Sequence, residues 1–115
     1  MHEASLALGI LELVEDAARR EGFRRVSSVR LEAGRLAGVE VSALRFALEA
    51  LAPGSCLEGA RFDIDEPRGH AWCSDCGQGI EIEQRGDACP RCGGIRLRVT
   101  EGAELRVVDL IVHDG

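Results

Sequence analysis

The sequence predicts an α+β fold: a small three-stranded sheet with two helices, plus an inserted zinc-ribbon-like module. Two segments repeat apolar residues at helical spacing, and three segments have the apolar patterns of strands. A doubled Cys-x-x-Cys sequence lies between residues 73 and 92, before the last of these strands. With 115 residues, the chain has room for one small domain and a metal module.

The first predicted helix covers residues 4–21, and Gly22 is suited to end it. Its apolar stripe advances by four, three and four residues. The stripe consists of Leu6, Ile10, Leu13 and Ala17, and is widened by Leu8, Leu11 and Val14. The second predicted helix begins at residue 42, with Ser42 as its N-cap, and ends at residue 51 before Pro53-Gly54.

The predicted strands cover residues 23–33, 60–66 and 104–113. The last is apolar almost throughout, which is typical of a central strand covered on both faces. Because this strand follows the cysteines, the metal module must interrupt the main domain. We therefore predict one α/β domain from residues 1–67 and 102–115, and a metal-binding module over residues 68–101 with short strands at 80–83 and 95–99.

The charge distribution argues against a nucleic-acid partner. The net charge is −6, and residues 67–101 hold five arginines against five acidic residues, so neither the chain nor the module has a basic footprint. No apolar run approaches the roughly 20 residues that a membrane-spanning helix needs. The N-terminal sequence lacks the layout of a signal peptide. We expect a cytoplasmic protein, because thiolate-bound zinc persists in a reducing compartment.

Four cysteines have the spacing of a structural zinc site: Cys73, Cys76, Cys89 and Cys92. Glycines follow both pairs, and positive φ at Gly77 and Gly93 would turn the chain tightly and aim backbone N–H groups at the sulfurs. Disulfides, a thioredoxin-like redox pair and a single iron are the alternatives that the spacing leaves open. The fifth cysteine, Cys56, is expected to be a small buried hydrophobe.

The histidines offer a second metal site. The α-amine of Met1, the amide nitrogen of His2 and its imidazole would form fused chelate rings, and the amide nitrogen of Glu3 can complete a square plane. Ni²⁺ and Cu²⁺ favour this geometry, and protonation of the amine and imidazole would empty the site in acid. A histidine at position 2 also occurs by chance. His70 is expected in a solvated loop, with a role as thiolate donor or spare ligand as its alternative, and His113 on the surface.

Five features occur in order along essentially the whole chain: Met1-His2-Glu3, Ser5-Leu6-Ala7, the segment 41–48 (VSALRFAL), the four cysteines, and Gly102-Ala103-Glu104-Leu105. Together they resemble the HypA/HybF family of nickel-insertion accessory proteins of [NiFe]-hydrogenase maturation. No hydrolase, P-loop, Rossmann or HExxH motif is present, which agrees with a protein that is not an enzyme.

The resemblance implies a nickel metallochaperone. Ni(II) would be its transferred cargo, bound by Met1, His2 and Glu3, and a structural and regulatory Zn(II) would be held by the four cysteines. The implied partners are a HypB-type nickel-handling GTPase and the [NiFe]-hydrogenase large subunit, and family members can also serve urease. We expect a monomer or weak dimer with no membrane or nucleic-acid partner. The alternatives are a zinc-ribbon module for protein or nucleic acid without a nickel role, and a thiol oxidoreductase.

Overall fold

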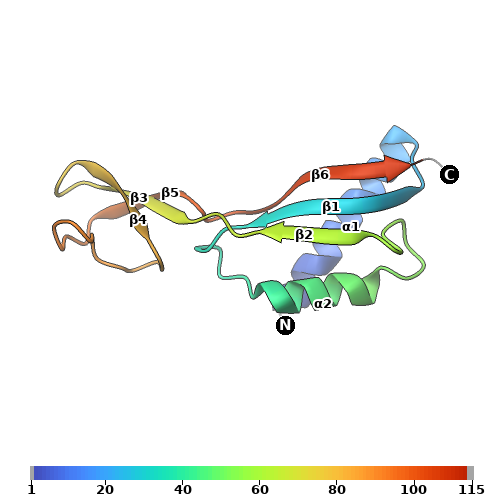
Figure 1. Ribbon diagram of the computed structural model, residues 1–115, viewed down its shortest axis with the longest axis horizontal. Coiled ribbons are helices and arrows are strands. Elements are labelled where there is room, and N and C mark those ends of the chain that lie inside the picture. The colour runs from blue at the N-terminus through green and yellow to red at the C-terminus, as the bar shows by residue number, and fades with distance from the viewer. Residues whose placement is uncertain (1, 114–115) are drawn as a thin grey trace. The chain divides into compact units, whose positions relative to one another are not determined.

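The computed structural model describes residues 2–113 and confirms the α+β class (Figure 1). Its strands form two three-stranded sheets, in the orders β2-β1-β6 and β4-β3-β5. The elements in chain order are α1 (His2–Glu21), β1 (Arg25–Ala33), α2 (Val41–Leu51), β2 (Arg61–Asp65), β3 (Gly69–Cys73), β4 (Gln78–Ile82), β5 (Leu97–Glu101) and β6 (Leu105–His113).

The chain divides into two compact units. The first contains the described parts of residues 1–31, 39–64 and 107–115, and the second contains residues 32–38 and 65–106. Both helices belong to the first unit, and all four cysteines of the doubled motif belong to the second. Neither helix of the described chain is both long and apolar enough to cross a membrane.

Helix α1 extends over the predicted range but buries a different stripe. Its buried residues are Ala7, Ile10 and Val14, whereas Leu13 is 54% exposed. Ile10 and Val14 belong to the predicted apolar set, whereas the prediction that Leu13 lies on the buried stripe is wrong and Ala7 was not predicted. Ala7, Ile10 and Val14 also follow helical spacing, and a helix with apolar residues on two stripes cannot be oriented by periodicity alone.

Helix α2 buries Leu44 and Leu48 and leaves Phe46 74% exposed. Its N-cap is Glu40, so the prediction of Ser42 is wrong. The Glu40 carboxylate accepts hydrogen bonds from the backbone N–H of Ser42 (3.2 Å) and from its hydroxyl (2.7 Å). A carboxylate two residues earlier therefore caps the helix in place of the serine oxygen.

The central strand of the first sheet is β1, and β6 lies at an edge. Five of the nine residues of β1 are buried, whereas no residue of β6 is. The prediction that residues 104–113 form a central strand is therefore wrong. An apolar run shows that a strand has apolar neighbours, but the number of strands pairing with it depends on the rest of the sheet.

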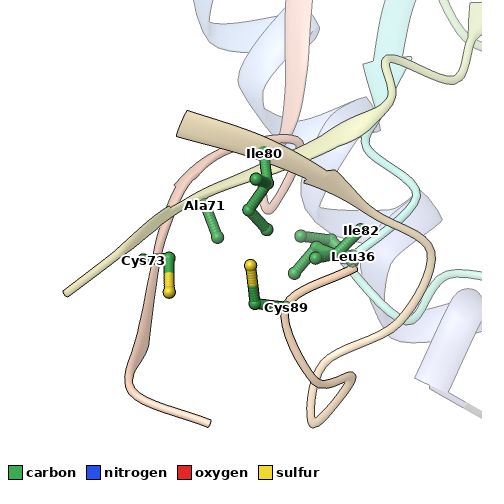
Figure 2. Close-up of a cluster of buried hydrophobic side chains, with 6 residues drawn as sticks. All are labelled: Leu36, Ala71, Cys73, Ile80, Ile82 and Cys89. Atoms are coloured by element: carbon green, nitrogen blue, oxygen red, sulfur yellow. The ribbon is translucent and has the colours of Figure 1, made fainter. Parts of the chain in front are cut away.

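The second sheet is built around β3, a strand that the sequence pattern did not predict. Strand β3 pairs antiparallel with β4 from Gly69↔Ile82 to Cys73↔Gln78, and with β5 on its other side. Strands β4 and β5 correspond to the predicted short strands at 80–83 and 95–99, each displaced by about two residues. Figure 2 shows the core of this unit, which consists of Leu36, Ala71, Cys73, Ile80, Ile82 and Cys89.

Two glycines allow a close backbone crossing in the second unit. The N–H of Gly34 donates to the carbonyl of Glu104 (3.0 Å), and the N–H of Leu36 donates to the carbonyl of Gly102 (2.8 Å). A Cβ atom on Gly34 would overlap the Gly102 carbonyl group. Residues 34–36 therefore pair with 102–104, which explains why they group with the cysteine-bearing unit.

Candidate metal sites

The four cysteines of the doubled motif converge on one point. Their sulfur atoms all lie within 4.8 Å of one another. The Sγ atoms of Cys73 and Cys92 are 3.6 Å apart, and those of Cys76 and Cys89 are 3.8 Å apart. Zn–S bonds of about 2.3 Å in a tetrahedron place the sulfurs about 3.8 Å apart. The cluster therefore fits a structural zinc ion.

Two tight turns position these sulfurs. Cys73 ends β3, and the N–H of Gly77 donates a hydrogen bond to the carbonyl of Cys73 at 2.8 Å. In the second turn, the N–H of Gly93 donates to the carbonyl of Cys89, also at 2.8 Å. Both glycines have positive φ, +66° and +76°, as the sequence predicts. N–H groups also point at sulfur: Arg91 donates to Cys89 Sγ and Gly94 donates to Cys92 Sγ, each at 3.4 Å.

An ion pair joins the chain segments next to the two turns. Arg96 Nε donates to Asp75 Oδ1 at 2.8 Å, linking the first Cys-x-x-Cys turn to the chain after the second. A Cβ atom on Gly94 would overlap the Asp75 carboxylate. A larger residue at position 94 would therefore require the Asp75 carboxylate to move away from its present position.

The electrostatics of the cluster call for a cation. Burial, followed by hydrogen bonds with the neighbouring thiols of Cys73, Cys89 and Cys92, raises the pKa of Cys76 to about 12. Burial also opposes ionisation of Cys89, but backbone N–H donors at residues 92 and 91 lower its pKa to about 7. Four thiolates this close repel one another, and a bound Zn²⁺ would compensate their charge when it displaces the protons.

The structure excludes two alternative uses of the cysteines. All five are free, and the 3.6 Å and 3.8 Å separations are far longer than an S–S bond of about 2.05 Å. Neither Cys-x-x-Cys pair opens a helix, as a thioredoxin-like redox pair would. A metal-binding cluster is the use that remains.

His70 is not a ligand of this cluster. It lies in β3, not in a loop as predicted, and the alternation of the strand places it on the face opposite Cys73. Its Nδ1 atom is buried without a hydrogen bond to any described residue, and lies 3.8 Å from Glu101 Oε2. The four-sulfur site consequently has no histidine within reach from this strand.

At the opposite end of the sequence, His2 and Glu3 form the first turn of α1. The side chain of His2 is 65% exposed, and its Nδ1 atom lies 3.9 Å from Glu3 Oε2. Met1, the other residue predicted for nickel, lies outside the described residues. Among those described, the four-cysteine cluster is the one group of three or more candidate ligands that converge.

Glu3 makes a contact that the sequence did not indicate. Its Oε2 atom accepts a hydrogen bond from the backbone N–H of Glu40 at 2.9 Å, which is the chief cause of a lowered pKa for this carboxyl group. Glu40 is the N-cap of α2, so the first turn of α1 is fastened to the start of α2. Glu3 and Glu40 are 37 residues apart in the sequence, so no local sequence pattern predicts this contact.

The other two residues discussed from the sequence are Cys56 and His113. Cys56 is buried, and burial together with the neighbouring Glu15 carboxylate raises the pKa of its thiol to about 11, as suits an inert core cysteine. His113 is exposed near the end of β6.

Comparison with known proteins places the chain in a family. Residues 1–112 match the family described as hydrogenase/urease nickel incorporation, metallochaperone, HypA. The chain is 61% identical over 114 residues to the hydrogenase maturation factor HypA of Cupriavidus necator, covering 99% of this chain and 96% of that protein. It is 60% identical to the HypA of Polaromonas naphthalenivorans, covering 99% of each.

Two solved structures share the fold. One is the solution structure of the Ni metallochaperone HypA from Helicobacter pylori, with a TM-score of 0.68 at 20% identity over 96% of each chain. The other is a solution structure of a HypA protein, with a TM-score of 0.70 at 24% identity, covering 100% of this chain and 98% of that one. From its residues, its four-sulfur cluster and these matches, we conclude that the chain belongs to the HypA family of nickel metallochaperones of hydrogenase maturation, which are not enzymes.

Proposed function

We propose that this chain binds one Ni(II) ion at its N-terminus and delivers it during maturation of a [NiFe]-hydrogenase. The α-amine of Met1, the amide nitrogen and imidazole of His2, and the backbone nitrogen of Glu3 would be the ligands. The observation that carries the proposal is the position of His2, exposed in the first turn of α1 in a chain of this family.

The helix terminus suits such a chelate. The first four N–H groups of an α-helix have no partner within the helix. The amide nitrogens of His2 and Glu3 precede the first i→i−4 hydrogen bond of α1, so a metal bound there would leave that ladder intact and would compete with the hydrogen bond between the Glu3 N–H and its own carboxylate. Ni(II) favours four nitrogens in a plane, whereas Zn(II) gains nothing from that arrangement.

Exposure of the chelate also suits transfer. A receiving site can replace the ligands one at a time, beginning with the imidazole, because the His2 side chain is accessible to solvent and to partners. Protons compete with the metal for nitrogen ligands, so acidification would favour release.

We propose that the zinc ligands are Cys73, Cys76, Cys89 and Cys92, and that the zinc shapes the surrounding unit for docking. The predicted functional division assigns nickel to residues 1–67 with 102–115 and zinc to residues 68–101. The compact units follow this division except at residues 32–38, 65–67 and 102–106, which group with the cysteines.

The partners we propose are a HypB-type nickel-handling GTPase and the hydrogenase large subunit, and the setting is the cytoplasm. The family description also names urease, so a urease could be a second recipient. The sequence alternative, a zinc-ribbon module without a nickel role, has no support from the relatives, which are named hydrogenase maturation factors.

The test is nickel titration of the untagged, zinc-loaded protein beside His2→Ala and His113→Ala. His113 is a matched control, because it too is an exposed histidine of the first unit. We expect the wild type and His113→Ala each to bind one equivalent of nickel. His2→Ala should not bind it. Zinc content and circular dichroism should be the same in all three.

Retention of tight nickel binding by His2→Ala would show that the N-terminal site is wrong. Absence of nickel binding in the wild type, with zinc bound normally, would instead favour the zinc-ribbon alternative. The two failures are distinguishable in one titration series.

A further inference from the structure

The four cysteines of the cluster differ in their exposure to solvent. Cys73 and Cys89 are buried in the core of the second unit (Figure 2). Cys76 is half-buried, and Cys92 is exposed. A small oxidant in solvent therefore reaches Cys92 more readily than the other three.

The residues next to Cys92 favour a reaction at its sulfur. Arg91, which precedes it, is cationic and exposed, and a Cβ atom on Gly93, which follows it, would meet nothing within 4 Å. Reactive cysteines have partly exposed, electropositive surroundings of this kind. Cys76, the other accessible cysteine, follows Asp75, so an acidic residue adjoins it in place of a cation.

Each sulfur of the cluster has a near neighbour in the other turn. Cys92 Sγ lies 3.6 Å from Cys73 Sγ, and Cys76 Sγ lies 3.8 Å from Cys89 Sγ. Both pairs join the first Cys-x-x-Cys turn to the second. The ion pair of Arg96 joins the same two segments of chain. The sulfurs are therefore placed to form S–S bonds between the turns when one of them is oxidised.

We propose that Cys92 is a site of oxidation by hydrogen peroxide, that Cys73 completes a disulfide bond with it, and that the reaction costs the cluster its zinc. The proposal rests on the zinc ligands proposed above and goes beyond nickel delivery. It makes the cluster a site of reversible modification as well as a structural one.

The chemistry proceeds in two steps. The Cys92 thiolate attacks one oxygen of hydrogen peroxide, so that an S–O bond forms, the O–O bond breaks and hydroxide leaves; the sulfur loses two electrons and becomes a sulfenic acid. The Cys73 thiolate then attacks this sulfur, so that an S–S bond forms, the S–O bond breaks and a second hydroxide leaves. Both hydroxide ions take up protons from the solvent.

The disulfide removes two of the four zinc ligands, because the thiolate is the form of cysteine that binds metal. Cys76 and Cys89 remain, and a second molecule of peroxide can oxidise them in the same way. Because the core of the second unit is small, that unit should lose stability with its zinc. His2 lies in the first unit, so the proposed nickel ligands would stay in place.

The position of Arg91 allows a sharp test, because trypsin cleaves there and separates the two cysteines of the second turn. Three tryptic peptides carry the four cysteines: 69–85 with Cys73 and Cys76, 86–91 with Cys89, and 92–96 with Cys92. Fragmentation of peptide 69–85 in the mass spectrometer tells its two cysteines apart.

The untagged, zinc-loaded protein is treated with hydrogen peroxide in the absence of nickel, and zinc release is followed with a chromogenic chelator. With dimedone present, which traps sulfenic acids, we expect the first label on peptide 92–96. Without dimedone, we expect the first disulfide to join Cys92 to Cys73, and to form as zinc is released.

Two histidine variants compare the accessible ligands, because imidazole can replace one thiolate on zinc. Cys92→His should lose zinc several-fold more slowly than the wild type in the same peroxide. Cys76→His is the matched control and should lose zinc at the wild-type rate. Cys56→Ser, which changes the buried cysteine outside the cluster, should also behave as the wild type. If a histidine variant does not load zinc, the peptide map of the wild type decides.

A first label on peptide 69–85 or 86–91 would overturn the proposal, and so would a first disulfide between Cys89 and Cys92. Zinc that stays bound while Cys92 is oxidised would overturn it as well. A wild type that holds no zinc before peroxide is added would contradict the proposed zinc ligands themselves. The nickel titration is independent of all these outcomes.

Discussion

Glu3 shows how one side chain links parts of the chain that lie far apart in sequence. Its carboxylate accepts from the N–H of Glu40, and the Glu40 carboxylate in turn caps α2 through Ser42. The first turn of α1 also holds His2. A contact that holds this turn in place therefore also holds the backbone that would bear the proposed nickel ligands.

The Glu3 contact should depend on pH. Because its pKa is lowered below the ordinary value of 4.5, the contact stabilises the fold above that pH and is lost as the pH falls through the lowered value. Nuclear magnetic resonance should detect this as a titration of the Glu40 amide shift with a midpoint below 4.5. In Glu3→Gln the contribution of Glu3 to this titration should be absent, leaving only the contribution of the Glu40 carboxyl group itself.

The same variant separates two roles of residue 3. Glu3→Gln keeps the backbone nitrogen, so its nickel stoichiometry should stay at one. Loss of nickel from Glu3→Gln would make the carboxylate itself a ligand. An unchanged Glu40 titration in the variant would show that the hydrogen bond to Glu3 is not its cause.

At the scale of elements, the composition of a strand does not decide its place in a sheet. Strand β6 has the most apolar sequence of the six and yet lies at an edge, while β1 occupies the centre of its sheet. Where the chain passes from β1 toward α2, Gly34 and Gly102 let two backbone segments approach closely.

Alanine at Gly34, in this crossing, and alanine at Gly9, in α1, should have opposite effects on the free energy of unfolding. Gly34→Ala would force a Cβ atom into the backbone of Gly102 and should lower the free energy of unfolding by about 1–3 kcal/mol. Gly9→Ala, within α1, meets nothing within 4 Å and should raise it by about 0.5–1 kcal/mol. Urea denaturation of the zinc-loaded proteins measures both changes. A neutral Gly34→Ala would mean that the crossing is looser than described.

At the scale of the whole molecule, the two proposed metal sites belong to different compact units. His2 lies in the first unit with both helices, and the four cysteines lie in the second. The core of the second unit is six residues, and two of them, Cys73 and Cys89, are among the proposed zinc ligands. A core this small needs the metal for its stability.

Removal of zinc should therefore affect the two units differently. Trp72, the single tryptophan, lies in β3 and reports on the second unit, whereas the helical circular dichroism signal reports on the first. We expect a strong chelator to change the Trp72 fluorescence and leave most of the helical signal. Cys73→Ser should reproduce the change without a chelator, in contrast to His2→Ala. Simultaneous loss of both signals would show that the two units unfold together.

Much of the secondary structure and the cysteine cluster can be predicted from local sequence patterns. The two helices, five of the six described strands and the convergence of Cys73, Cys76, Cys89 and Cys92 depend on spacings of a few residues, or on the strong chemical preference of thiolates for one metal. The family resemblance strengthened the prediction for His2, whose position in an exposed first helical turn the structure supplies.

Only the tertiary structure decided which of these elements are covered and by what. It selected Ala7, Ile10 and Val14 as the buried stripe of α1, placed β1 rather than β6 at the centre of its sheet, made residues 69–73 a strand, and joined Glu3 to Glu40. Each outcome depends on a partner distant in sequence, and a residue's own neighbours carry no information about that partner.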